Sequence, residues 1–236
     1  MIKPDIICVQ PPFIDYPAFR ATMTSIKDKI NKLIIVFTNQ NVKGKMDLRW
    51  FISNALPFST TVVYPEIEGD WRNNAINEGL EESDADWLWF IEQDFMFTTP
   101  FTDKLLAQDK FDCVAYKQGE RWHPCCILIK RSILDQTSKD FSANPPVSDH
   151  FGKFIEEVEK LTTIGNLSDL GIEPKEGFHY NGVTHNYYLM MIKQYKNLYR
   201  PDLFKIYNNL ALTAPVAQQP NFLKLMQETD EYLAQK

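Results

Sequence analysis

The sequence has no long apolar run and no excess of positive charge. None of its segments approaches the about 20 apolar residues that cross a bilayer, and the N-terminal apolar run is too short for a signal peptide. We therefore expect a soluble, cytoplasmic protein without a membrane partner. The formal net charge of −6 gives no general attraction to nucleic acid, so a polyanionic partner would need a local basic patch.

The four cysteines lack the paired spacing of zinc sites. They are Cys8, Cys113, Cys125 and Cys126. The last two are adjacent within an apolar run, which favours buried thiols over metal ligands. We expect all four to be reduced and structural, as is usual in a cytosolic protein.

The 236 residues contain no internal repeat, no low-complexity stretch and no clear linker. Hydrophobic residues make up 44%, which is ordinary for a globular protein of this length with one substantial core. We therefore predict a single domain over residues 1–236 with a helical extension from about residue 201. The amphipathic pattern of this extension would let it pack on the core or on a second subunit of a homodimer.

Short apolar runs alternate with helical patterns in the first half of the chain. Strands separated by helices predict an α/β fold with a mixed, mostly parallel central sheet and helices on both faces. The helix that follows Asp70 has this residue as a candidate N-cap. The expected strands are 5–10, 32–39, 60–66 and 87–91, and the expected helices are 19–30 and 71–83.

The second half has a less regular pattern. The segment "CCILIKRSIL" indicates a strand that passes into a helix, and residues 138–149 are rich in turn-forming residues. A further strand is expected at 111–118, and further helices are expected at 150–161 and 185–195.

Two carboxylates follow the most hydrophobic strand, in the stretch "WLWFIEQDFMF". Glu92, Gln93 and Asp94 come directly after the apolar run 87–91. Ligands of open α/β sheets bind beyond the carboxyl ends of the strands, so this triplet is expected at a ligand cleft. Its two carboxylates would suit Mg²⁺ or Mn²⁺, which would then bridge to a diphosphate. The alternative is a solvated acidic turn.

The residues before this triplet carry a family resemblance. The order Arg72, Ala75, Asn77, Gly79, apolar strand and acidic triplet resembles nucleotide-sugar glycosyltransferases of the GT-A fold, especially family two. The resemblance covers roughly residues 5–185. The first acid of the triplet is Glu92 where the family usually has aspartate, which still supplies a carboxylate with a longer reach.

Downstream residues extend the resemblance. Asp149 opens a helical pattern, and "HYNGVT" contains His179, Gly182 and Thr184 in the order of a family motif. The resemblance implies that His179 completes a metal site with Glu92 and Asp94. It also implies that Asp149 faces the acceptor as a catalytic base, although Ser148 stands where the family usually has an acid.

Each of these residues also has an ordinary structural interpretation. Asp149 could be only the N-cap of its helix. His179 could be a loop histidine bonded to the backbone, and the same holds more strongly for His185. Arg72 could simply pair with Glu81 or Asp84.

Several polar side chains are candidates for binding a nucleotide-sugar donor. Gln10 and Asn39 stand at the ends of the first two strands, and their amides can bond to a pyrimidine edge. Trp122, between two expected strands, could line the sugar or acceptor site or form a packed turn. The full set of donor-binding candidates is Gln10, Pro11, Asn39, Arg72, Asn77, Gln93 and Trp122.

The resemblance implies a metal-dependent glycosyltransferase. It would move a hexosyl or pentosyl unit from a nucleotide sugar, by default a UDP-sugar, to a hydroxyl acceptor with Mn²⁺ or Mg²⁺ as cofactor. The acceptor stays open among a small molecule, a polysaccharide, a protein and a modified DNA base. One alternative is a catalytically silent nucleotide-sugar-binding protein. Another is a nucleotidyltransferase, which the absence of a Gly-rich loop in "VQPPFIDYP" disfavours.

Overall fold

The structure is a computed structural model, and it describes residues 1–10, 23, 26–37, 60–63, 71–92, 95–143, 150–173 and 176–179. By its internal contacts the chain divides into two compact units, residues 1–15 with 19–178 and residues 16–18 with 179–236. The first unit is the one described below. The expected helices at 185–195 and from about 201 lie outside the described residues, so the single-domain organisation stays a prediction.

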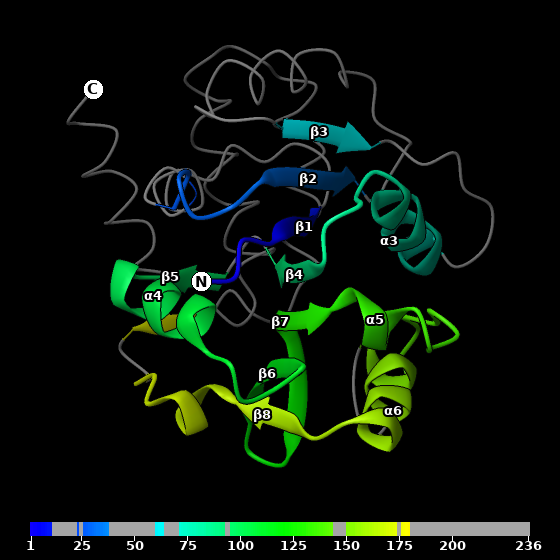
Figure 1. Ribbon diagram of the computed structural model, residues 1–236. Helices are drawn as coiled ribbons and strands as arrows, with labels where there is room; N and C mark the ends of the chain where they lie inside the picture. The colour runs from blue at the N-terminus through cyan, green and yellow to red at the C-terminus, as the bar shows by residue number, and fades with distance from the viewer. Residues whose placement is uncertain are drawn as a thin grey trace, which may run out of the picture. The chain divides into compact units, whose positions relative to one another are not determined.

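Within the described part of the chain, seven strands form one sheet in the order β3-β2-β1-β4-β7-β6-β8 (Figure 1). The strands β3, β2, β1 and β4 are parallel, β7 is antiparallel to β4 and β6, and β8 is parallel to β6. The mixed, mostly parallel sheet is therefore confirmed. The strands are β1 (Asp5–Gln10), β2 (Lys32–Phe37), β3 (Thr60–Val63), β4 (Trp87–Glu92), β6 (Cys113–Gln118), β7 (Arg121–Lys130) and β8 (Ile164–Asn166).

Helices cover both faces of this sheet, as the sequence predicts. One face carries α3 (Trp71–Glu81), α5 (Arg131–Leu134) and α6 (Gly152–Leu161) (Figure 1). The other face carries α4 (Thr99–Ala107), whose Phe101 stacks on Trp89 of β4 at 6.4 Å between ring centroids. None of the described helices is both long and apolar enough to cross a membrane.

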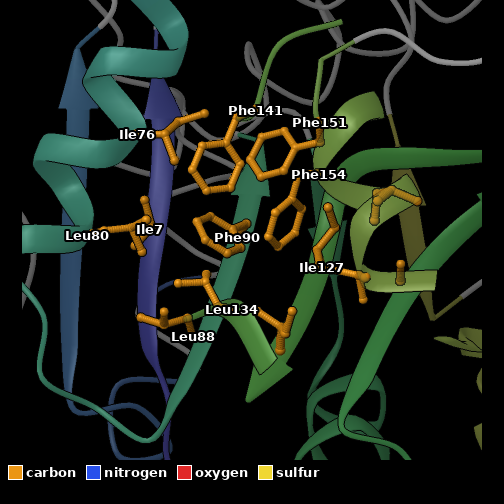
Figure 2. Close-up of a cluster of buried hydrophobic side chains, with 14 of the residues drawn as sticks. Ile7, Ile76, Leu80, Leu88, Phe90, Ile127, Leu134, Phe141, Phe151 and Phe154 are labelled. Atoms are coloured by element: carbon orange, nitrogen blue, oxygen red, sulfur yellow. The ribbon is translucent and has the colours of Figure 1, made fainter. Parts of the chain in front are cut away.

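On the face of the sheet that carries α3 and α6, every second strand residue points into the core. Ile7 of β1, Phe90 of β4 and Ile127 of β7 point into it, and Ile76 of α3 packs against them (Figure 2). Residues 88–91 of β4 are all buried, which is typical of a strand covered on both faces. The continuous apolar run in the sequence is thus explained by the two helical layers.

Helix α4 and four short elements were not predicted from the sequence. The side chain of Thr98 caps α4 by accepting from the Phe101 N–H at 3.5 Å, and Pro100 stands in the first turn. Both signals are present in "TTPFTDKLLA". The short elements are β5 (Phe95–Phe97), β8 (Ile164–Asn166), β9 (Gly177–His179) and the 3-10 helix η1 (Leu167–Leu170).

The four cysteines are free and buried, which confirms the sequence-based prediction. The Cys126 Sγ accepts a hydrogen bond from the Trp89 Nε1–H at 3.3 Å. Burial raises the pKa of Cys126 to about 12, and burial, with Cys126 and Asp112 nearby, raises the pKa of Cys113 still further. These thiols are therefore packing groups.

Gly79 lets α3 approach the sheet closely. A Cβ added at this position would lie 2.6 Å from Cγ2 of Val36 and 3.6 Å from Cγ2 of Ile7. We expect Gly79→Ala to lower the free energy of unfolding by about 1–3 kcal/mol, although alanine has the better helix propensity by about 1 kcal/mol. Thermal unfolding followed by circular dichroism should show a Tm lower by about 2–10 °C.

The matched control is the double variant Gly79→Ala/Val36→Ala. Removal of Cγ2 of Val36 makes room for the new methyl group, so the second substitution should cost less in the Gly79→Ala background than alone. A Tm for Gly79→Ala at or above that of the parent would show that the helix can shift without strain.

Candidate functional site

The carboxyl ends of four parallel strands meet at one edge of the sheet. Gln10 is the last residue of β1, and Glu92 is the last residue of β4. Val9 pairs with Glu92, and Gln10 pairs with Phe37 at the end of β2. The structure therefore brings the backbones of Gln10 and Glu92 together at the edge where the sequence predicts a ligand cleft.

The side chain of Glu92 is half-buried at this edge. By the period of the strand, Glu92 follows Leu88 and Phe90 on the face that packs against α3 and α6. A carboxylate in this position lies at the border between the core and the ends of the strands.

A second, two-stranded sheet follows directly after the acidic triplet. It consists of β5 and β9, and the Thr98 N–H donates to the Glu176 carbonyl at 2.8 Å. Because the residue after β5 bonds to the residue before β9, β9 runs back along β5.

The hairpin of β6 and β7 extends past the end of β4. The last pair between β4 and β7 is Ile91 with Cys126, whereas β7 begins five residues earlier, at Arg121. The register of β6 and β7 shifts after Ala115, next to Pro124, which has no N–H for the ladder.

Trp122 belongs to β7, so its predicted place between two strands was wrong. Its Nε1–H donates to Oε1 of Glu159 on α6 at 2.7 Å, and Nζ of Lys117 lies 5.1 Å from the ring centroid. The half-buried indole also packs against the core cluster. Trp122 thus joins the hairpin to α6, and its binding of a donor stays a prediction.

Two asparagines of α3 form hydrogen bonds with the backbone of residues 139–141. The Nδ2 group of Asn77 donates to the carbonyls of Asn73 at 3.0 Å and Lys139 at 3.2 Å. Oδ1 of Asn73 accepts from the Phe141 N–H at 2.8 Å. Asn73 was not singled out from the sequence, where its only signal is a place one helical turn before Asn77.

Four aromatic rings close the ends of the turn-rich loop. Figure 2 shows Phe90, Phe141, Phe151 and Phe154 gathered together, and their centroids lie 4.9–6.3 Å apart. The Phe151 N–H also donates to the Phe141 carbonyl at 2.9 Å. Phe141 and Phe151 are thereby held together.

Helix α6 begins at Gly152, two residues later than predicted. Its N-cap is Phe151, in the left-handed conformation with φ 69° and with no side-chain capping bond. Asp149 is therefore not the N-cap, and that alternative for its role was wrong.

The predicted site residues fall into three groups. Glu92, Asn77 and Trp122 have described side chains, whereas Gln10, Arg72 and His179 are placed only as members of β1, α3 and β9. The described side chains contain no group of three or more His, Cys, Asp or Glu that could hold a metal. The site residues outside the described residues are Pro11, Asn39, Gln93, Asp94 and Asp149.

Comparisons with known proteins bear on the fold. No protein-family model matches the chain, and no curated protein matches it significantly. A mannosyltransferase from Pyrobaculum calidifontis, solved in complex with GDP-Man and Mn²⁺, superposes with a TM-score of 0.52. Its identity is 13%, and the match covers 100% of this chain and 81% of that one. The fold is GT-A-like.

A second solved structure superposes on this GT-A-like chain about as well as the first. It is the 4-diphosphocytidyl-2C-methyl-D-erythritol synthase from Anaerococcus prevotii, with a TM-score of 0.51 and 12% identity. The match covers 70% of this chain and 88% of that one. The resemblance indicated by the sequence motifs is thus confirmed for the fold, which both structures share with this chain.

Proposed function

We propose that the protein is a metal-dependent glycosyltransferase that moves a sugar from a nucleotide-sugar donor to a hydroxyl acceptor. The observation that carries this proposal is the position of Glu92 at the carboxyl end of β4, the edge at which ligands bind in open α/β sheets. The GT-A-like fold and the motif order around Glu92 support it.

Glu92, Asp94 and His179 would hold Mn²⁺ or Mg²⁺. Carboxylate oxygens suit both ions, and imidazole is a weaker supporting ligand for Mn²⁺. The inclusion of His179 rests on its place in the motif order of the sequence. When bound, the ion would neutralise the charge of the departing diphosphate.

The donor would lie along the carboxyl edge of the sheet. Gln10, Pro11 and Asn39 would contact the base, with uridine as the default. Asn77 has both Nδ2–H groups directed to backbone carbonyls, so it would contact the donor through Oδ1. The remaining donor contacts are assigned to Arg72, Gln93 and Trp122.

Asp149 would accept the proton of the acceptor hydroxyl if the enzyme inverts configuration. The carboxylate of Asp149 would take this proton. The oxygen of the acceptor hydroxyl would then attack the anomeric carbon of the donor sugar as the bond from that carbon to the diphosphate breaks. A retaining enzyme would not need this base.

A nucleotidyltransferase is the second candidate. The similar likeness to the diphosphocytidyl-methylerythritol synthase favours it. The sequence directly after β1 argues against it, because "PPF" stands where a Gly-rich phosphate loop would be expected.

One assay separates these functions by their products. The protein is incubated with Mn²⁺ and a panel of nucleotide sugars, with desalted lysate as the acceptor source, and separately with nucleoside triphosphates and sugar phosphates. Release of a nucleoside diphosphate with sugar transfer supports the proposal, whereas release of pyrophosphate supports nucleotidyl transfer. Donor binding without either product would identify a silent binding protein.

A further inference from the structure

Trp122 stands beyond the end of β4, on the hairpin of β6 and β7. The last pair between β7 and β4 is Cys126 with Ile91, and Trp122 lies four residues further toward the hairpin tip, at most about 14 Å along the chain. The carboxyl end of β4 is the edge at which ligands of open α/β sheets bind. A nucleotide sugar that lies along this edge can therefore reach Trp122.

The indole of Trp122 lies on the same face of the sheet as Glu92. It packs against the core cluster that includes Phe90 of β4 and Phe154 of α6, and its Nε1–H donates to Glu159 of α6. Glu92 belongs to this face by the two-residue period of β4. The ring and the proposed metal ligand thus share both an edge and a face of the sheet.

The order of the strands matches the order of the parts of a nucleotide sugar. Neighbouring strands in the sheet are β1, β4 and β7, and at this edge they carry Gln10, Glu92 and Trp122 respectively. In the proposed function the base lies at Gln10 and the diphosphate lies at the metal held by Glu92. The sugar is on the far side of the diphosphate from the base, so it is directed toward β7.

Two charged side chains hold the ring of Trp122. Oε1 of Glu159 accepts from its Nε1–H at 2.7 Å, and Nζ of Lys117 lies 5.1 Å from the ring centroid, within the range of a cation–π contact. Lys117 is also the partner of Trp122 in the ladder of β6 and β7. The indole is therefore held in one orientation before any ligand binds.

What the ring still offers to a ligand is apolar surface. The side chain is half-buried, so part of the indole reaches solvent. Its N–H is bonded to Glu159 and is therefore not the donor for a phosphate oxygen of the diphosphate. A sugar ring carries C–H groups that pack against an aromatic surface while its hydroxyls bond to polar groups elsewhere.

We propose that Trp122 packs against the transferred sugar of the donor, and that Glu159 and Lys117 are positioning residues that fix its ring. This inference rests on the proposed function, in which Trp122 is a donor contact. It assigns that contact to the hexosyl or pentosyl unit and not to the base or the diphosphate.

The test is the gain in affinity that the sugar provides. Calorimetry with Mn²⁺ compares UDP-glucose with UDP and GDP-mannose with GDP. We expect Trp122→Ala to weaken binding of the nucleotide sugar about 3–10-fold and to leave binding of the diphosphate unchanged. Glu159→Ala should cause a smaller loss of the same kind, about 2–4-fold, because the ring must then be ordered on binding.

Conservative variants separate positioning from folding. Trp122→Phe keeps an aromatic surface, and Glu159→Gln keeps an oxygen that can accept from the indole N–H, so each should recover most of the loss of the matching alanine variant. Lys160→Ala removes an exposed charge from the next position of α6 and should bind every ligand as the parent does.

Fluorine NMR observes the ring directly in protein labelled with 5-fluorotryptophan. The chain has five tryptophans, and the resonance of Trp122 is the one missing from Trp122→Phe. This resonance should shift with UDP-glucose or GDP-mannose more than with the diphosphate alone, and it should broaden in Glu159→Ala.

Two results would overturn the inference and leave the proposed function intact. One is an equal loss of affinity for the nucleotide sugar and the diphosphate in Trp122→Ala. The other is a Trp122 resonance that responds identically to both ligands. A parent protein that binds none of the four nucleotides with Mn²⁺ would instead contradict the proposed function, and the inference would fall with it.

Discussion

Replacing Asp94 by alanine should abolish the Mn²⁺-dependent binding of UDP. The substitution removes one of two proposed carboxylate ligands, and the charge of the diphosphate is then poorly compensated. We expect the affinity for UDP in the presence of Mn²⁺ to fall by about 100-fold or more. Isothermal titration calorimetry at fixed Mn²⁺ measures this loss, and unchanged binding would exclude Asp94 from the metal site.

A graded series makes this result specific. His179→Ala should weaken binding clearly but less than Asp94→Ala, and His185→Ala should have a smaller effect still, because only His179 ends β9. Asp86→Ala is the control, since this exposed aspartate precedes β4 at its amino end. A larger loss from His185→Ala than from His179→Ala would show that the loop binds in another register.

Asp149→Asn should slow sugar transfer by about 10²–10⁴-fold while the protein stays folded. The substitution keeps the size of the side chain but removes its ability to accept a proton at neutral pH. The structure removes one competing explanation, because Phe151 and not Asp149 is the N-cap of α6. Turnover is measured as nucleoside diphosphate release, and folding is checked by circular dichroism.

The control for this substitution is Asp135→Asn. Asp135 is exposed and pairs with Lys139 at 2.9 Å, an exposed ion pair that contributes little to stability. It should leave turnover unchanged. Normal turnover in Asp149→Asn would mean that another group takes the proton or that the enzyme retains configuration.

The parallel half of the sheet was predictable because its strands are continuous apolar runs. Strand β1 was predicted with its bounds, and β4 was predicted to within one residue of its end at Glu92. Such runs are buried on both faces and stop where the chain reaches the ligand edge. Apart from α4, the elements that were not predicted are short, and β5, β8 and β9 have three residues each. Three residues give too little periodicity to distinguish a strand from a loop.

The candidate site was predictable only where a residue stands at the end of a strand that has a clear apolar pattern. Glu92 was placed correctly because it ends β4, whereas Trp122 was misplaced because Gly119 and Pro124 obscured a strand that is bent by a bulge. Asn73 could not be recognised, since its role depends on Phe141, which is 68 residues away in the chain. Interactions of this kind become visible only when the fold is known.

The buried cysteines make the folded chain a poor substrate for alkylating reagents. With a pKa of about 12, only about one Cys126 thiol in 10⁴ would be ionised at pH 8, and the thiolate is the species that reacts. Alkylation of Cys113 and Cys126 must therefore pass through openings of the sheet that expose β6 and β7. The rate at which iodoacetamide labels these two thiols therefore measures how often the central strands separate. No introduced probe is needed for this measurement.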